Sequence, residues 1–394
     1  MTKFLKGGSA AAMGLCAMMA TGTSVQAQDF TIKTSGRVMI DYAIANADNS
    51  DAEWSASELR RLRLGVSGTY GPNVKYKAEL NTNSSGDINA EDAWLEFAPG
   101  EGKVKIKAGQ FKTPNSLDEL TSSRFISTLE RSAFTDAFQF DRRVGVMVST
   151  GAKNYSLSAG VFGTNLENSG TEEGIAIAAR ATYAPILSDE MTVHLGASTR
   201  YRNQKEDSDI RYRQRPYTHI PGRIISTGSF AGKDMFYGVE AGVISGGLFA
   251  TGEYGITNAD NAGVGDNADF SGGYAEAGVF FGGHKTYKGG KYNRPVVDNP
   301  VTGGGYGAVA LVARYDTLDL TDDVVNGGNL DTVVLGVDWY PVKNARIGIN
   351  YFNADADLGT STSGLDAEFA ALVSAQAVTT ETVNGFVARL GFDF

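Results

Sequence analysis

FVARLGFDF, residues 386–394 at the end of the chain, is the stretch that decides the fold. From Ala388 onward its apolar residues occupy every second position and alternate with Arg389, Gly391 and Asp393. A period of two is typical of a β-strand with one apolar and one polar face. The same period recurs along the chain. It predicts about sixteen antiparallel strands, at residues 30–44, 58–70, 73–81, 88–97, 103–111, 142–150, 155–163, 174–184, 191–202, 233–244, 247–257, 270–281, 306–316, 331–340, 345–353 and 384–394.

This period alone does not separate a soluble β-sandwich, with its apolar face inward, from a membrane β-barrel, with its apolar face toward lipid. Three observations favour the barrel: signs of export, predicted strands of near ten residues, and turns that alternate in length. Short turns such as Gly71-Pro72 lie between long polar loops, which is the pattern of outer-membrane barrels. We therefore expect an all-β, transmembrane, antiparallel up-and-down β-barrel, wide enough at sixteen strands to enclose water.

The first 27 residues have the features of a secretory signal peptide. Lys3 and Lys6 supply a positive start, a short apolar stretch follows, and Val25-Gln26-Ala27 is a small-x-small cleavage site. Cleavage there would leave residues 28–394 as a single barrel domain without cysteine, because Cys16 is the only one in the chain. A lipoprotein signal ending at Cys16 is the alternative, and the leucine before that cysteine fits it poorly.

Residues 282–305 break the predicted pattern of turns. They occupy the place of a short turn, yet they run for 24 residues and carry several basic side chains. Either this segment folds into the mouth of the barrel, or it hides an extra hairpin that would raise the strand number to eighteen. We favour the first interpretation.

Acidic side chains are concentrated in three predicted loop segments, at residues 257–270, 316–331 and 354–383, which contain no Lys or Arg. They account for the net charge of −10, and the rest of the chain is nearly neutral. Blocks of one sign among Gly, Asn and Thr are typical of solvated loops. They would keep the loops soluble, or they would bridge to lipopolysaccharide of the outer membrane through divalent cations. A pI near 5.0 and the lack of basic patches argue against nucleic acid as a partner.

Basic residues recur on the polar faces of three predicted strands that are near neighbours in sequence. Strands that follow one another in an up-and-down barrel lie side by side, so these side chains would form one basic wall of the lumen. Arginine suits oxyanions through its planar fork, and lysine acts as a mobile point charge. The wall residues are Arg61, Arg63, Lys75, Lys77, Lys103, Lys105 and Lys107. The alternative is an ordinary lumen of mixed charge, with some of these lysines at its rim.

Two predicted loops add further candidate contacts for anions. The long loop at residues 112–141 is expected to dip into the lumen, where Lys112, Arg124 and Arg131 would face the solute. Arg211, Arg213 and Arg215 recur at every second position and would share one face of an extended segment. A solvated rim is the alternative for these three.

Several segments resemble the phosphate-selective porin O and P family of outer-membrane porins. They are LRRLRLGVSG from Leu59, KAGQFKTPNSLDELTSSRFISTLERSAF from Lys107, RYRQRPYTHIPGRIISTG from Arg211, GAVALVARYDTLDL from Gly307 and LGVDWYPVKNARIGINY from Leu335. The resemblance extends over most of the predicted mature chain and is most specific at Gln110–Arg131.

The resemblance implies a homotrimeric barrel of sixteen strands in the outer membrane of a Gram-negative bacterium, with loops folded inward as a constriction. It also implies that lumenal Arg and Lys guide anions, and that Phe394 is the terminal aromatic signal for barrel assembly. The chain departs from a strongly anion-drawing protein through its acidic loops and through acids near the expected constriction, at Asp118, Glu119, Glu130, Asp136 and Asp141.

We therefore expect a porin for passive diffusion of small hydrophilic solutes, with preference for small anions such as phosphate. The alternatives are a weakly selective general porin and, in another class, a structural or adhesive barrel with a plugged lumen. An enzyme is not expected, since the three histidines lie far apart and no nucleophile–base or metal-binding spacing stands out. No cofactor and no metal is expected.

Overall fold

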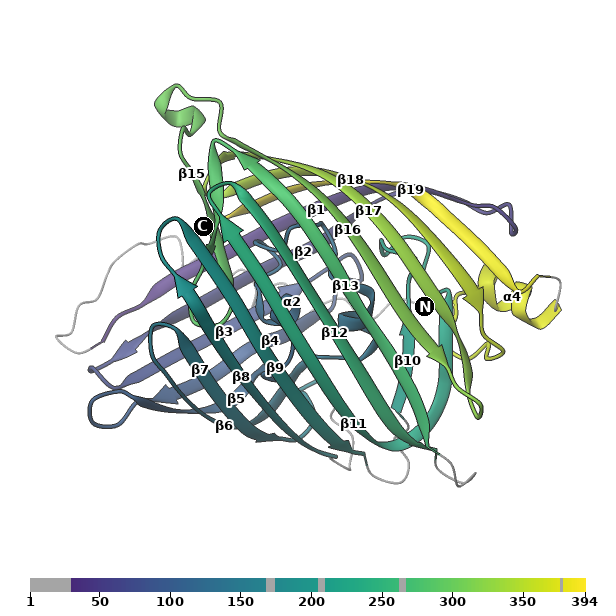
Figure 1. Cartoon of the computed structure of the whole chain (residues 1–394), viewed down its shortest axis with the longest axis horizontal. Helices are drawn as coiled ribbons and strands as arrows, with labels where there is room; N and C mark the ends of the chain where they lie inside the picture. The colour runs from purple at the N-terminus through teal and green to yellow at the C-terminus, as the bar shows by residue number, and fades with distance from the viewer. Residues whose placement is uncertain (1–29, 168–173, 205–209, 262–266, 376–377) are drawn as a thin grey trace, which may run out of the picture.

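The computed structural model describes residues 30–167, 174–204, 210–261, 267–375 and 378–394, which form a closed antiparallel β-barrel (Figure 1). Within these residues sixteen strands make up the barrel wall. They are β1 (Lys33–Ala47), β2 (Glu53–Tyr70), β3 (Val74–Thr82), β4 (Ile88–Phe97), β5 (Val104–Lys112), β6 (Arg142–Gly151), β7 (Tyr155–Phe162), β8 (Ile175–Leu187), β9 (Met191–Asn203), β11 (Ile225–Ser245), β12 (Leu248–Asn261), β13 (Ala268–Phe281), β16 (Ala308–Thr321), β17 (Asn326–Val342), β18 (Ala345–Leu358) and β19 (Thr380–Asp393). The predicted fold is thereby confirmed. The predicted signal peptide, residues 1–27, lies outside the described residues.

The barrel closes where the first strand pairs with the last. β1 and β19 run antiparallel in register from Arg37 opposite Asp393 to Ala47 opposite Val383. At the end of this seam, Gly36 N–H donates to the main-chain oxygen of Phe394 at 3.1 Å. A Cβ at Gly36 would come within 2.3 Å of the Phe394 ring, so glycine makes room for the terminal aromatic residue.

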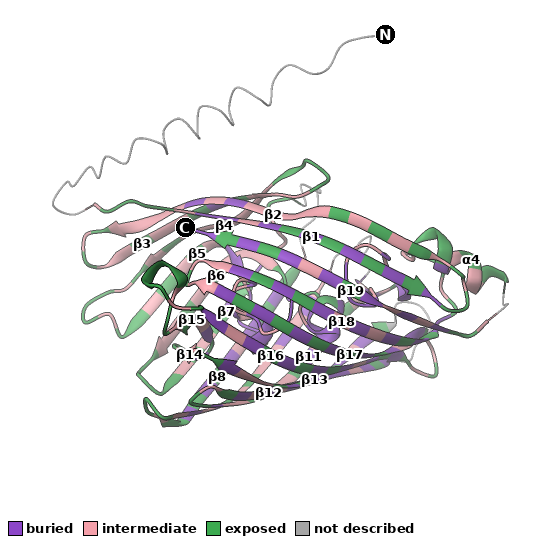
Figure 2. Ribbon diagram, turned by 90° about the horizontal axis from the view of Figure 1, so that it is seen from above, coloured by how far each residue is buried: buried purple, intermediate pink, exposed green. Residues whose placement is uncertain are grey.

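Apolar side chains point away from the lumen, as predicted. On β1 the side chains of Tyr42 and Ile44 are exposed, whereas the intervening Asp41 and Ala43 are almost fully buried. Figure 2 shows the same alternation of buried and exposed residues along the neighbouring strands. A soluble sandwich would show the opposite pattern, so the exposed apolar residues mark the surface that faces lipid.

The barrel wall is not equally high on all sides. Strands β3 to β7 are 8 to 10 residues long, whereas the other wall strands reach 13 to 21 residues. We call β3 to β7 the low wall. Its strands carry Lys75, Lys77, Lys105 and Lys107, four of the seven residues predicted to form the basic wall.

Several strands extend further into the acidic segments than predicted. β12 runs to Asn261 rather than 257, β16 to Thr321 rather than 316, and β18 to Leu358 rather than 353. The prediction that these acidic segments are loops was therefore wrong where the segments adjoin β12, β16 and β18, because those residues belong to the strands. Main-chain pairing continues beyond the apolar band because charged side chains in water do not oppose it.

The segment at residues 282–305 is both an inward fold and a hairpin. It contains β14 (Gly283–Tyr287) and β15 (Tyr292–Val297), which pair only with each other. This periplasmic hairpin (residues 283–297) lies inside the end of the barrel that carries the short turns (Figure 1). An eighteen-stranded barrel is therefore wrong, and the favoured interpretation is confirmed.

Two inward loops occupy part of the lumen. The constriction loop (residues 113–141) contains α2 (Leu117–Leu120) and α3 (Ala133–Ala137), and Figure 1 shows α2 within the barrel. The loop between β9 and β11 contributes β10 (Ile210–Gln214), which pairs with β11. α4 (Ala367–Ala375) lies in the last long loop. None of the helices in the described residues is long and apolar enough to span a membrane.

An aromatic cluster packs the constriction loop against the wall. Phe138 and Phe140 of the loop contact Phe236 of β11, and the Phe140 and Phe236 ring centroids are 4.6 Å apart. Phe138 also contacts Tyr212 of β10, and Phe134 packs against Phe138 and Phe140. Four of these five side chains are at most 1% exposed. The core of the molecule therefore lies inside the barrel, between loop and wall, and fixes one side of the lumen.

Candidate functional site

Three arginines from the wall bind main-chain oxygens of one short stretch of the constriction loop, residues 126–131. Arg346 of β18 donates to Ile126 O and Ser127 O at 2.9 and 3.1 Å. Arg389 of β19 donates to Leu129 O, and Arg314 of β16 donates to Glu130 O at 2.9 Å. We call Arg314, Arg346 and Arg389 the arginine clamp. Since an arginine fork holds two acceptors at a fixed angle, the clamp sets the path of the loop.

Each clamp arginine is paired with an aspartate of the wall. Asp338 binds Arg346 through two bonds of 2.7 Å, and Asp316 binds Arg314 at 2.8 Å. Asp41 binds Arg389 at 2.7 and 2.6 Å. All six side chains are less than 9% exposed. Buried ions need such pairing, because desolvation of a lone charge is costly.

The start of the constriction loop is held by a carboxylate. Glu253 of β12 accepts hydrogen bonds from the main-chain N–H groups of Leu117 and Asp118, at 2.9 and 2.6 Å. These are the first N–H groups of α2, which have no partner within a helix. Together with the clamp, this contact holds the loop against the longer wall strands β12, β16, β18 and β19.

The space left beside the loop is a cavity of about 1480 Å³ against the low wall. Its lining includes eleven of the thirteen predicted basic residues, namely Arg61, Arg63, Lys77, Lys103, Lys105, Lys107, Lys112, Arg124, Arg131, Arg213 and Arg215. Lys75 and Arg211 are not part of the lining. Lys75 is more than half exposed and lies 4.0 Å from Glu96, at the end with the short turns.

Several wall residues are paired with acids that sequence reasoning did not assign to them. Lys77 binds Asp92 at 2.6 Å, and Lys107 lies 3.2 Å from Glu96. Other pairs join Arg63 to Glu79 and Glu91, and Lys103 to Glu101 in an exposed turn. Arg61 and Lys105 have no ion pair within the described residues. The wall is therefore a ladder of paired cations with two unpaired members.

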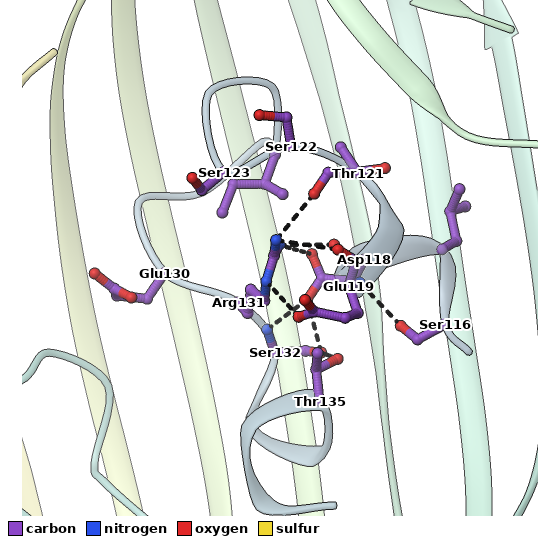
Figure 3. A network of polar contacts seen from close by, with 12 residues as sticks. Ser116, Asp118, Glu119, Thr121, Ser122, Ser123, Glu130, Arg131, Ser132 and Thr135 are labelled. Atoms are coloured by element: carbon purple, nitrogen blue, oxygen red, sulfur yellow. Dashed lines mark hydrogen bonds and ion pairs between the residues drawn. The ribbon is translucent and has the colours of Figure 1, made fainter. Parts of the chain in front are cut away.

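A compact ion cluster forms at the constriction loop (Figure 3). Arg131 donates to Glu119 Oε2 at 2.7 Å and to the main-chain oxygens of Asp118 and Thr121 at 2.7 and 2.9 Å. Lys112 lies 2.6 Å from Glu119 Oε1. Burial alone would raise the pKa of the Glu119 carboxyl, but Arg131 and Lys112 outweigh it and hold that pKa below its ordinary value.

The other predicted loop residues lie at two separate places. Arg124 binds Asp393 of β19 at 2.8 Å. On β10, Arg211 and Arg213 alternate with buried residues and so share a face, as predicted. Arg215 lies 3.5 Å from Asp136. The predicted constriction residues therefore lie in three separate places, with Arg211 outside the cavity lining, and do not form one ring.

Sequence reasoning missed several cations that also line the cavity: Arg37, Arg60, Arg142, Arg143, Arg180, Arg223 and Lys291. The alternation gave a usable signal for two of them, since Arg37 and Arg180 occupy the lumenal phase of β1 and β8. Lys291 lies in the periplasmic hairpin, whose fold the sequence left open.

His194 and His219 serve as structural contacts. His194 lies between Glu240 and Tyr287, with its ring nitrogens 3.0 and 2.7 Å from their oxygens. His219 lies 3.7 Å from Glu58. Within the described residues, no group of three or more His, Cys, Asp or Glu is arranged to hold a metal ion.

Known proteins resemble this chain over most of its length. An uncharacterized protein of Caulobacter vibrioides is 35% identical over 341 residues, which are 82% of this chain and 68% of that protein. Porin O of Pseudomonas aeruginosa is 26% identical over 93% of this chain and 89% of its own length.

A solved anion-selective porin from Comamonas acidovorans has the same fold, with a TM-score of 0.57 at 14% identity over 93% of this chain and all of that chain. The family described as phosphate-selective porin O and P matches residues 32–382. The chain therefore belongs to the phosphate-selective porin O and P family and forms an outer-membrane porin channel.

Proposed function

We propose that this porin lets small hydrophilic solutes diffuse passively and prefers small anions, phosphate among them. The observation that carries the proposal is the charge of the cavity. Among the described residues, 18 Lys and Arg but only 8 Asp and Glu line it, an excess of 10 positive charges. The whole chain, in contrast, has a net charge of −10. A passage lined by one sign raises the local concentration of ions of the opposite sign.

The unpaired cations are best suited to attract a passing anion. Arg61 and Lys105 have no ion pair within the described residues, and Arg37 donates only to the Ser123 hydroxyl, at 2.8 Å. An ion must exchange part of its water for such groups and then leave again. Paired lysines such as Lys77 are already neutralised at short range. The proposed binding strength is therefore spread over many weak contacts.

Reversal potentials across a planar bilayer in a KCl gradient test the proposal. The double variant Arg61→Gln/Lys105→Gln should lower the chloride-to-potassium permeability ratio several-fold. Its matched control is Lys75→Gln/Lys153→Gln, which removes the same number of charges at exposed positions outside the cavity lining. The control should leave the ratio close to that of the wild type. Cation preference of the wild type would overturn anion selectivity, and a lack of current would favour a plugged barrel.

A weakly selective general porin is the second candidate, and the paired wall favours it. If the acids beside Lys77, Lys107 and Arg63 neutralise the positive charge of the basic wall, the chloride-to-potassium permeability ratio should be near one. Inorganic phosphate then separates the candidates. Phosphate should reduce chloride conductance at millimolar concentration in an oxyanion-binding channel, and only at much higher concentration in a general porin.

The low wall supports a homotrimer. Nine residues of strand give roughly 30 Å of length and, at a tilt of about 40°, roughly 23 Å of height, slightly less than the ~25 Å apolar band of such barrels. We propose that partner subunits cover this wall. Leu95→Cys on β4 should then give disulfide-linked subunits, whereas Val337→Cys on β17 should not. Both side chains are more than half exposed.

Three further assignments complete the proposal. Residues 1–27 direct export and are removed, and Phe394 directs barrel assembly. The acidic outer segments bridge to lipopolysaccharide through divalent cations. The N-terminal sequence of the purified protein tests the first, since it should begin at Gln28. Deletion of Phe394 should reduce the amount of folded barrel in the membrane, and a chelator should weaken lipopolysaccharide binding.

A further inference from the structure

An apolar band crosses the inner face of the low wall, where the surrounding lumen is charged. It follows two adjacent rungs of paired residues on β4 to β8. The first rung runs Trp94, Gly109, Gly145, Phe162, Ala176, and the second runs Met147, Gly160, Ala178. Outer-membrane barrels normally have polar interiors.

Glycines and aromatic rings give this band a flat floor. A Cβ at Gly145 or Gly160 would come within 2.5 or 2.8 Å of the Phe162 ring, so that ring lies directly over both glycines. Phe111 meets Phe162 edge to face at 5.6 Å, and both rings are less than 5% exposed. The floor is therefore closed and cannot be deepened by a solute.

Trp94 and Met147 are the parts of the band that remain accessible. Both are half-buried and line the cavity. Gly109 lies opposite Trp94 and has a φ of 121°, a conformation that favours glycine. Lys107 Nζ stands 4.2 Å from the centre of the Trp94 ring and holds the indole in place.

Cations border the band on three sides. Lys107 lies at its edge, and Lys77 is the direct partner of Trp94 on β3. From the periplasmic hairpin comes Lys291, whose side chain makes no ion pair within the described part of the chain. Burial lowers the pKa of Lys291, and the nearby charges of Lys107, Arg180 and Lys77 lower it further. All three lysines line the same cavity as Trp94 and Met147.

We propose that this band is a subsite for organic anions that carry an aromatic ring beside a carboxylate or phosphate. The inference rests on the proposed anion preference and narrows it to a class of solute. The ring stacks on the edge of Trp94 and on the Met147 thioether, while the anionic group faces Lys291. Lys107, which also pairs with Glu96, lies at the edge of the band. A charged lumen alone gives such a solute no advantage over a small inorganic anion. The apolar contact supplies that advantage.

Single-channel recording with benzoate and acetate tests the subsite, since the two ions share a carboxylate and differ in the ring. Benzoate should reduce chloride current in the wild type at a concentration on the order of tenfold lower than acetate, the effect of one aromatic stacking contact. Trp94→Ala should bring the two concentrations together. The matched control, Trp54→Ala, removes an indole that packs on Phe369, outside the cavity lining, and should preserve the difference.

Lys291→Gln provides a second variant in the turn between β14 and β15, outside the strands that form the barrel wall. It should weaken benzoate and acetate equally, because it removes only charge. Equal action of the two anions on the wild type would overturn the subsite and leave the anion channel standing. A benzoate preference that persists in Trp94→Ala would also overturn it. Cation selectivity in KCl would instead overturn the proposed function itself.

Discussion

Arg389 on the last strand and Asp41 on the first strand are joined by two hydrogen bonds of 2.7 and 2.6 Å across the seam of the barrel. The same guanidinium donates to Leu129 O and to Glu130 of the constriction loop. One side chain thus ties three parts of the molecule together.

Arg389→Gln should destabilise the barrel and loosen the constriction loop. The change leaves the Asp41 carboxylate, which is only 1% exposed, without its cationic partner. Such a buried unpaired charge lowers the free energy of unfolding by about 3–5 kcal/mol. Thermal unfolding in detergent should show a lower midpoint, and single-channel records should show added flicker. Asp41→Asn in the same chain removes the orphaned charge and should recover part of the midpoint. If Asp41→Asn does not raise the unfolding midpoint of the Arg389→Gln variant, the two side chains are not energetically coupled.

Glu253→Ala should free the start of the constriction loop without changing the charge that faces the cavity. Two main-chain N–H groups of α2 lose their acceptor, at a cost of about 1–3 kcal/mol each if they stay buried. The expected result is channel closure at lower voltage than in the wild type, with unchanged ion selectivity. A shift in selectivity would show that Glu253 acts on ions directly.

The Glu119 ion pairs should persist below the ordinary pKa of a glutamate. Because the folded pKa of Glu119 is depressed, its contribution to stability is complete above the unfolded value near ~4.3 and is lost only as the pH falls through the lower folded pKa. Conductance should thus show no step from this group between pH 7 and about 4.5. Glu119→Gln should raise the chloride-to-potassium ratio, since Lys112 and Arg131 lose their counter-charge. An unchanged ratio would place these two cations out of reach of the permeating ion.

Lys285→Gln should release the periplasmic hairpin from the lumen. Lys285 lies between the rings of Phe249 and Tyr292, at 4.1 and 4.2 Å, and binds Glu276 at 3.1 Å. Losing this buried cation should increase channel conductance and expose the hairpin to protease from the side of the short turns. Lys288→Gln, on an exposed turn, is the control. Equal proteolysis of both variants would contradict the anchoring role of Lys285.

The fold could be predicted from the sequence because each wall strand carries its own evidence. Alternation on β1 or β19 is visible in a few residues, and a strand slipped by one position would place its charges in lipid. The ends of the strands were predicted less accurately, since the main chains of β12, β16 and β18 continue to pair with their neighbours beyond the apolar band. There the pairing no longer depends on which side chains face outward.

The basic wall could be named from the sequence, but its pairing could not. Lys77 and Asp92 lie on different strands, and their contact depends on a register that shifts between Ala78 and Leu80. The constriction loop depends on still more distant partners, since Arg314, Arg346 and Arg389 each follow the loop residues that they bind by more than 180 residues. Contacts of that range come from barrel closure and leave no local pattern.

The arginine clamp also makes the constriction loop depend on closure of the barrel. Arg389 reaches the loop from the last strand of the chain, while its aspartate lies on the first. The loop thus lacks a complete set of anchors until the two ends of the chain have met. A barrel opened at its seam would lose part of its constriction together with the pairing of its first and last strands.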